Sequence, residues 1–236
     1  MSRRRQRWVL IGAGVTTLVL VAHWPVTTRV GVNYQGSSRR MPLYEKAINF
    51  ISRDLQTRRI AQDITAGASG EDDRLVKIAA WVTAHIHAVP SSLPVVDDHP
   101  LHILIRGYGA EDQRAEAFAL LAGYSGFRAS VAKLRPPGAA TPVMMGLVQA
   151  GHRTLAFDVI HEVIFRNERG ALADVQELLR NPALVTSAAH GLVIDGLPYE
   201  QYVMELRHSG SGFSRNEAQQ PWQRLRQELA RLTGRP

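Results

Sequence analysis

"RGYGAEDQRAEAF", residues 106–118, is the stretch that decides the fold of this chain. A Gly-x-Gly turn runs directly into an amphipathic helix, predicted over residues 112–122, in the arrangement that often presents a catalytic nucleophile. The first residues of that helix are acidic, and the chain of 236 residues contains no cysteine. The stretch therefore poses the question of what this helix start presents.

Two helices are predicted on the N-terminal side of this stretch. Apolar residues recur near helical spacing over residues 42–65, until Gly67 and Gly70 break the pattern. A second helix is predicted over residues 71–90, with acidic residues at its N-terminus and Pro90 as its stop. The patterns rest on Leu43, Ile48, Ile51, Leu55 and Ile60 in the first helix and on Leu75, Ile78, Ala79, Val82 and Ile86 in the second.

Strand patterns follow on the C-terminal side. We predict strands in "GFRASVAKL" (126–134), "PVMMGLVQAG" (142–151) and "HRTLAFDVIHEVIFRN" (152–167), with a turn around Gly151. Helices are predicted again at 171–182, 197–209 and 221–234. Helices, then strands, then helices predict an α+β fold, in which an antiparallel sheet packs on helices.

Charge and composition narrow the function classes. The net charge is +7, and the arginines crowd both ends of the chain, whereas the middle is mixed. A nucleic-acid-binding domain would need a basic face with interleaved aromatic residues, and the sequence shows none. The absence of cysteine excludes disulfides, thiolate metal sites and a thiol nucleophile.

The N-terminus predicts a membrane anchor. "WVLIGAGVTTLVLVAHW", residues 8–24, has no charged residue, and as a helix it would span about 25 Å. Its terminal tryptophans suit the two membrane interfaces, and the arginines before it place the N-terminus in the cytoplasm. A cleaved signal peptide has a similar pattern, but His23, Trp24 and Pro25 make a poor cleavage site. We therefore expect a single-pass protein of the bacterial inner membrane, with its domain in the periplasm.

This topology sets the expected domain boundaries. Residues 1–7 form a cytoplasmic tail, 8–26 the anchor and 27–40 a Gly/Ser-containing linker. The folded domain covers 41–208, with a core at about 70–180. The tail, 209–236, carries an amphipathic helix that could pack on its own domain, on a partner or on a membrane surface.

The order of short motifs resembles the transglutaminase-like superfamily, which has a papain-like fold. A helix containing Trp-Val-x-x-x-Ile precedes the Gly-rich turn, and "GFRAS" follows Ala115 at the distance of the family's Gly-Ile-Pro-Ala-Arg phrase. "RTLAFDV" places Asp158 at the family's aspartate, and "FRNERGALADVQELL" resembles a phrase of bacterial members. The resemblance covers residues 70–180 and implies the family's helix-on-sheet core.

The resemblance also implies a departure in chemistry. The family transfers acyl groups with a Cys-His-Asp triad. Here the cysteine position falls on Glu111 or Ala110, and the histidine position falls near Val143 or Met144. Only Asp158 matches, so we expect no acyl transfer. Acidic residues in a first helical turn are also explained by the helix dipole alone.

Other polar residues could line the same cleft. They are Asp97, Asp98, His99, His102, Glu111, Asp112, Gln113, Asp158 and His161. Together they could form an acid–base pair or hold a divalent metal. However, Pro100 argues against a helix that places His99 and His102 on one face, and a strand would point Asp158 and His161 apart. The sequence therefore assigns no metal, cofactor or catalytic residue.

Two functions remain open. The first is a transglutaminase-like domain without catalysis, which binds a peptide, a glycan or an envelope protein, with a polysaccharide-related system as one setting. The second is a hydrolase or transamidase with non-cysteine chemistry in the same cleft, with or without a metal. The absence of both cysteine and strand histidine favours the first.

Overall fold

The computed structural model describes residues 3–30, 37–93 and 99–208, with four isolated positions beyond them. The chain divides into two compact units, Met1–Arg53 and Asp54–Pro236, and each is described by itself. The boundary between them lies inside one helix, α2 (Leu43–Thr65). The sequence had suggested a domain start near Met41.

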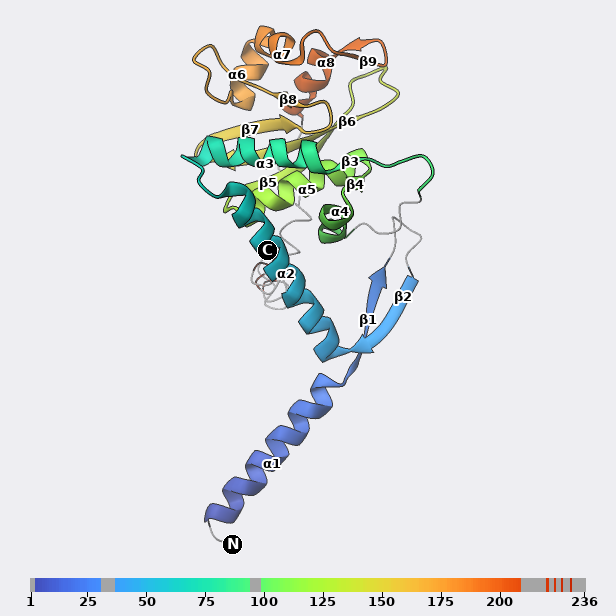
Figure 1. Ribbon diagram of the computed structural model, residues 1–236, viewed down its shortest axis with the longest axis vertical. Helices are drawn as coiled ribbons and strands as arrows, with labels where there is room; N and C mark the ends of the chain where they lie inside the picture. Colours follow the sequence, from blue (N-terminus) through green and yellow to red (C-terminus); the bar gives the residue numbers. More distant parts are fainter. Residues whose placement is uncertain are drawn as a thin grey trace. The chain divides into compact units, whose positions relative to one another are not determined.

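The first unit contains α1 (Arg3–Ala22), the strands β1 (Pro25–Val30) and β2 (Ser37–Pro42), and the start of α2. The two strands pair antiparallel as a hairpin (Figure 1). Both lie largely within the segment 27–40 that was expected to be a linker. The backbone N–H of Leu43 donates to the carbonyl of Trp24 at 3.0 Å, so the chain returns at the base of the hairpin to the end of α1.

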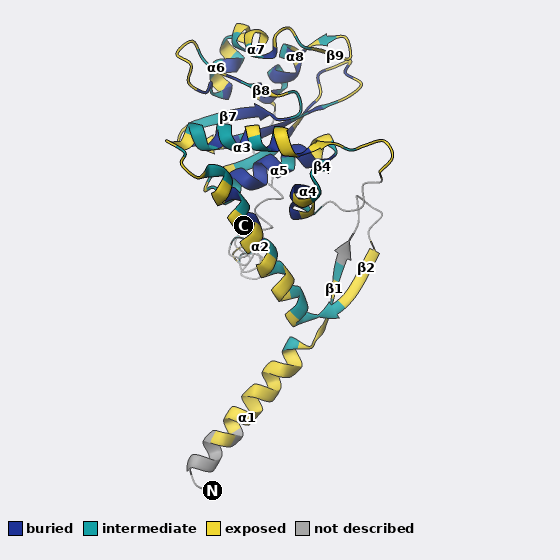
Figure 2. Cartoon of the chain, in the orientation of Figure 1, coloured by how far each residue is buried: buried dark blue, intermediate teal, exposed yellow. Residues whose placement is uncertain are grey.

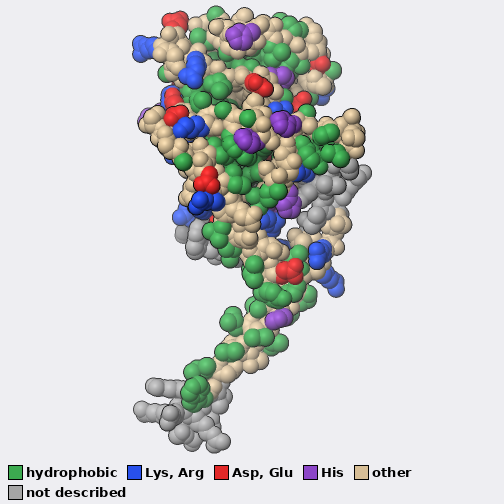
Figure 3. Space-filling model, viewed as in Figure 1, with side chains coloured by type: hydrophobic (Ala, Val, Ile, Leu, Met, Phe, Trp, Pro, Cys, Tyr) green, Lys and Arg blue, Asp and Glu red, His purple; other side chains and the backbone are tan. Residues whose placement is uncertain are grey.

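Helix α1 exposes its apolar side chains. Figures 2 and 3 show this helix with exposed residues and with hydrophobic side chains on its surface. Among the described residues, no helix is both long enough and apolar enough to cross a membrane.

The second unit combines helices with a four-stranded antiparallel sheet in the order β5-β6-β7-β8. The sheet strands are β5 (Arg128–Leu134), β6 (Val143–Ala150), β7 (Arg153–Asp158) and β8 (Val163–Ile164). The helices besides α2 are α3 (Glu71–His85), α4 (Pro100–Arg106), α5 (Glu111–Tyr124), α6 (Val175–Arg180), α7 (Pro182–Ala189) and α8 (Tyr199–Met204), which continues as the 3-10 turn η1 (Glu205–Arg207). Two short pairs complete the unit: β3 (His87–Ala88) with β4 (Tyr108–Gly109), and β9 (Val193–Ile194) with β10 (Leu197–Pro198). The predicted α+β class is therefore confirmed.

The side chains of β6 point alternately into two hydrophobic cores, one on each face of the sheet. In β6, Val148 and Ala150 belong to the cluster that contains α3 and α5, whereas Val143 and Met145 belong to the cluster that contains α6, α7 and α8. This period of two is what a strand buried on both faces requires. Figure 1 shows the two helical layers on either side of the sheet.

Close packing holds α5 on the sheet. Phe118 of α5 is fully buried and lies over Gly146 of β6, where an added Cβ would overlap its ring. Its ring also contacts Phe157 of β7, with centroids 4.9 Å apart. Only a residue without a side chain fits under Phe118, so this glycine fixes the distance between helix and sheet.

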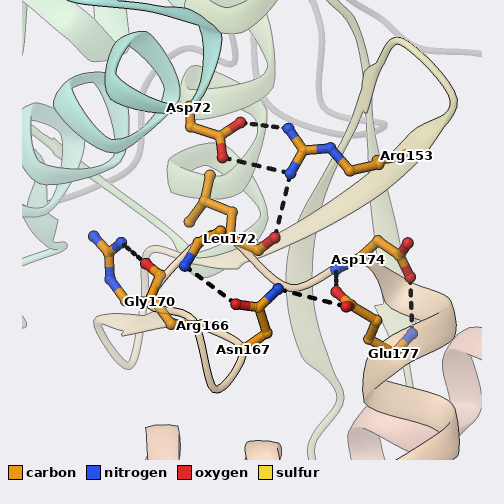
Figure 4. Close-up of polar contacts among 9 residues, drawn as sticks. Asp72, Arg153, Arg166, Asn167, Gly170, Leu172, Asp174 and Glu177 are labelled. Atoms are coloured by element: carbon orange, nitrogen blue, oxygen red, sulfur yellow. Dashed lines mark hydrogen bonds and ion pairs between the residues drawn. The ribbon is translucent and has the colours of Figure 1, made fainter.

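A polar cluster connects α3, β7 and the segment before α6 (Figure 4). Arg153 forms a two-pronged ion pair with Asp72, at 2.6 and 3.4 Å, and donates to the carbonyl of Leu172 at 3.3 Å. Asp174 and Glu177 form a reciprocal capping box at the start of α6. These contacts hold the segment between β8 and α6 against β7 and α3.

Several boundaries differ from the predictions. Helix α3 ends at His85, before Pro90, and His87, inside the predicted helix 71–90, lies in β3. The predicted strand 152–167 is wrong, because β7 ends at Asp158 and a turn precedes β8. Helix α2 exists, yet Ile48, Ile51 and Leu55 of its predicted apolar pattern are exposed.

Candidate functional site

The Gly-x-Gly turn positions the start of α5. Gly107 ends α4 with a φ of 72°, in the left-handed region that favours glycine. The side-chain oxygen of Gln113 accepts hydrogen bonds from the backbone N–H of Ala110, at 3.1 Å, and from Arg106, at 2.8 Å. Gln113 is buried and holds the turn together, so this predicted cleft residue has a structural role.

The acidic residues at the helix start remain on the surface. Glu111 and Asp112 are both exposed, and one oxygen of Asp112 accepts from the backbone N–H of Gln113 at 3.0 Å. Their position in the first turn of α5 is favourable for negative charge. The helix therefore presents two carboxylates to solvent in its first turn.

Asp158, the last residue of β7, is a buried carboxylate with four hydrogen-bond donors around it. One oxygen accepts from the backbone N–H groups of Ile160 and His161, both at 3.0 Å. The other accepts from the ring Nδ1 of His161 at 2.8 Å and from the hydroxyl of Tyr199 at 2.6 Å. The side chain is completely buried, so these bonds replace its lost solvation.

The turn after β7 brings His161 back to Asp158. This corrects the expectation that the two side chains point apart, because that expectation assumed a continuous strand. Glu162 has a φ of 61° and reverses the chain before β8. The hydrogen bond to Asp158 is the main cause of a raised pKa for His161; burial opposes it, Asp158 and Glu111 add favourable charge, and Arg114 opposes it.

Tyr199 completes the cluster from α8. It is fully buried, and burial, followed by the charge and hydrogen bond of Asp158, raises its pKa well above the ordinary value. The hydroxyl therefore stays protonated and serves as a donor. The imidazole of His161 and the buried hydroxyl of Tyr199 thus both bind the same carboxylate oxygen of Asp158.

Arg114 links the start of α5 to this cluster. Its guanidinium is buried and donates to the carbonyl of Val159 at 3.1 Å. Within the described part of the chain, its Nε has no hydrogen-bond partner. This hydrogen bond therefore joins the first turns of α5 to the residue directly after β7.

A pocket of about 450 Å³ opens between α3 and the β7–β8 turn. The α3 wall consists of small side chains, and the opposite wall is apolar except for Asp158 and Glu162. The lining residues are Ala79, Ala80, Thr83, Ala84, Phe157, Asp158, Val159, Glu162, Val163 and Ile164. The pocket therefore offers an apolar space with an acidic side chain exposed at its edge.

His99 and His102 form a separate pair. Pro100 begins α4, where proline is favoured because its missing N–H needs no partner, and His99 caps that helix by accepting from the N–H of Leu101 at 3.2 Å. The two imidazole rings lie 5.0 Å apart, so the expectation that Pro100 prevents a helix here is wrong. The predicted candidates Asp97 and Asp98 lie outside the described residues. Among the described residues, no group of three or more histidine, aspartate or glutamate side chains could hold a metal ion.

Sequence reasoning missed three parts of this site. Tyr199 is distant in the chain and carries no motif, and Arg114 reads as an ordinary polar residue of an amphipathic helix. The small residues of α3 could have been noticed, since Ala79, Ala80, Thr83 and Ala84 share one side of the helix. Val143, near which the resemblance placed the family's histidine, is buried in the core.

Comparisons with known proteins give little guidance. The sequence matches no protein-family model and no curated protein significantly. Among solved structures, the chain is similar to a candidate protease from Parabacteroides distasonis, with a TM-score of 0.38 and 11% identity over 55% of this chain. The match covers 35% of that protein, so this chain spans about a third of its length. A similarity of this size identifies neither a family nor an activity.

Proposed function

We propose that this chain is a membrane-anchored, transglutaminase-like domain that binds a ligand beside the β7–β8 turn and does not transfer acyl groups. The observation that carries the proposal is that both carboxylate oxygens of Asp158 already accept hydrogen bonds from other residues. The four hydrogen bonds that its carboxylate accepts all come from within the domain, and Glu111 lies at the helix start to which the resemblance assigns the family's nucleophile. A carboxylate cannot reproduce the nucleophilicity of a thiolate.

The pocket suggests what the domain binds. Its apolar walls suit a hydrophobic side chain, and the exposed carboxylate of Glu162 suits a positive charge next to that side chain. A peptide segment of an envelope protein combines these features more readily than a glycan does. The proposed role is therefore that of a recognition component in a cell-envelope assembly.

Occupancy of the pocket can be tested by photo-crosslinking in cells. A photoreactive amino acid in place of Ala84, which is exposed and lines the pocket, should give a discrete adduct. The same amino acid in place of Ala183, an exposed alanine of α7 outside the pocket, is the matched control. The adduct at position 84 should disappear when Ala80→Trp fills the pocket. An adduct that persists in the Ala80→Trp protein would place the partner elsewhere.

The alignment with the family can be tested by restoring the thiol. Because the chain has no cysteine, Glu111→Cys introduces a single thiol at the start of α5. The helix N-terminus and the neighbouring imidazolium of His161 should lower the thiol pKa from about 8.5 to below about 7.5. The pH profile of alkylation by iodoacetamide measures that value.

Two controls separate the causes of a lowered thiol pKa. Ala183→Cys places a thiol in the first turn of α7, so it reports the effect of a helix start at another site. Adding Asp158→Asn to Glu111→Cys removes the support of His161 and should raise the thiol pKa again. If Glu111→Cys titrates like Ala183→Cys with or without Asp158, the correspondence between Glu111 and the family cysteine is wrong.

The membrane anchor is proposed from α1. Trp8 and Trp24 are 66% and 67% exposed at the two ends of its apolar run, and the side chains between them include Leu10, Ile11, Val15, Leu18 and Leu20, all at least half exposed. A surface of this kind needs a hydrophobic environment. We expect the protein to resist alkaline extraction from inner membranes, with the domain on the periplasmic side. A mature N-terminus between His23 and Thr28 would contradict an uncleaved anchor.

A hydrolase is the alternative, and the pair of Asp158 and His161 is the observation in its favour. The side chain of His161 is 25% exposed, and Asp158 fixes the orientation of its ring, as in enzymes whose histidine activates water. A metal could assist such chemistry. Hydrolysis of a peptide or amide substrate that Asp158→Asn abolishes without lowering the melting temperature would favour this alternative.

A further inference from the structure

The junction after α1 carries a concentration of positive charge. Residues 23–53 contain five basic residues and one acidic residue, Glu45, which gives a net charge of +4. The basic residues are Arg29, Arg39, Arg40, Lys46 and Arg53. This charge lies directly beyond the apolar run of α1, where a membrane surface would be if α1 is an anchor.

Aromatic side chains surround the same junction. The ring of His23 lies 5.2 Å from the ring of Tyr44, and Trp24 and Tyr44 are 67% and 43% exposed. The ammonium group of Lys46 donates to the carbonyl of Thr27 at 2.8 Å, which ties the start of α2 to β1. Exposed tryptophan and tyrosine next to basic residues are typical of the region of lipid headgroups.

The hairpin exposes two adjacent arginines that have no acidic partner in the part of the chain that the structure describes. Arg39 pairs in register with Thr28, and Arg40 pairs with Thr27, so the two arginines lie on opposite faces of the hairpin. Both are exposed, and neither forms a salt bridge with a described acidic residue. A two-stranded hairpin is only marginally stable in water, so an external surface that binds it would add to its stability.

We propose that the β1–β2 hairpin and the start of α2 form a headgroup-binding collar, defined by Trp24, Arg39, Arg40, Tyr44 and Lys46, that binds anionic phospholipids. This inference rests on the proposed anchoring by α1, which keeps the collar at the membrane surface. Guanidinium groups bind phosphate oxygens in a two-pronged geometry, and each basic residue at an anionic surface contributes about a fivefold gain in affinity. The collar would hold the periplasmic domain close to lipid and would bind less tightly at high salt.

The test uses the full chain in two kinds of lipid nanodisc, one of phosphatidylcholine and one containing phosphatidylglycerol. Hydrogen exchange of the backbone amides of residues 37–41 should be several-fold slower with phosphatidylglycerol. Arg39→Gln with Arg40→Gln should remove most of that difference, as should 0.5 M salt. Arg128→Gln with Arg169→Gln, which removes equal charge from exposed positions in the other unit, should leave it unchanged.

The outcomes separate the collar from the anchor. If the chain fails to enter either nanodisc, the proposed anchor is wrong. If the chain enters both and residues 37–41 exchange at the same rate in both, the anchor stands and the collar is wrong. Soluble glycerol phosphate at millimolar concentration should not reproduce the protection in phosphatidylcholine discs; if it does, the arginines bind free phosphate groups and the lipid assignment is wrong.

Discussion

Replacing Asp158 by asparagine changes the charge at the centre of the site while keeping its size. The asparagine oxygen can still accept from the two backbone N–H groups of the turn. Its amide, however, faces the hydroxyl of Tyr199 and the Nδ1 of His161, which both donate to the carboxylate in the wild-type protein. The variant therefore loses two hydrogen bonds to a charged acceptor, and only rotation of the hydroxyl and a neutral imidazole can compensate.

The expected loss is large because the carboxylate is completely buried. A hydrogen bond to a charged group contributes about 1.5–3 kcal/mol, and partial compensation by the amide leaves a net loss of about 2–4 kcal/mol in the free energy of unfolding. For a domain of this size, that corresponds to a fall in melting temperature of roughly 5–15 °C. Ligand binding should recover at low temperature, where the variant is folded.

The loss should depend on pH. The pKa of His161 is raised in the folded protein, chiefly by its hydrogen bond to Asp158. The stability from this pair is thus fully present below the unfolded pKa of about 6.5 and is lost as pH rises through the higher folded pKa. The difference between wild type and Asp158→Asn should therefore be larger at pH 6 than at pH 9.

Urea unfolding at these two pH values measures the difference, and NMR titration of His161 measures its pKa in both proteins. In the variant, the pKa of His161 should fall, since burial remains and the carboxylate is gone. Equal urea midpoints with an unchanged His161 titration would refute the structural role of Asp158. Loss of a hydrolytic activity at unchanged stability would instead make Asp158 part of a catalytic pair.

Three further substitutions test the packing around the site. Gly146→Ala places a methyl group against the ring of Phe118 and should cost about 1–3 kcal/mol by overpacking, measured by urea unfolding, with partial recovery when Phe118→Leu is added. Tyr199→Phe removes a donor to the buried carboxylate and should cost about 1.5–3 kcal/mol; a variant as stable as wild type in thermal unfolding would contradict this. Arg153→Gln breaks a partly exposed ion pair with Asp72 and should cost no more than about 1 kcal/mol at low salt, with a smaller effect at 0.5 M salt.

The sequence predicted the elements with strong periodicity. The strand predicted over residues 142–151 is β6. Its side chains point alternately to the two faces of the sheet, and both faces are buried in a core. The helix after the Gly-x-Gly turn became α5, since its small and apolar residues fit against that sheet. Short elements were missed: α4 begins with a proline that reads as a breaker, and α7 has only eight residues.

The geometry of the site was harder to predict, because it depends on where one strand ends. The run from His152 to Asn167 is apolar enough to continue as a strand, and periodicity alone cannot locate the turn within it. Once β7 stops at Asp158, the carboxylate accepts from the backbone of residues 160 and 161 and captures the ring of His161. An aspartate whose side chain accepts hydrogen bonds from the next backbone N–H groups favours a turn. Any aspartate in the chain could do this, so the sequence alone does not show that the turn lies at Asp158.

The same turn argues for binding over catalysis. The hydrogen bond to Asp158 raises the pKa of His161, so the ring stays protonated over a wider pH range, and only the deprotonated ring can act as a general base. The exposed carboxylate of Glu111, at the start of α5, also favours the protonated form of that ring. Asp158 and Glu111 are thus two carboxylates that both favour the protonated form of His161. We propose that this arrangement stabilises the turn beside the pocket, and that the pocket, not the charged pair, is the part of the site that a ligand occupies.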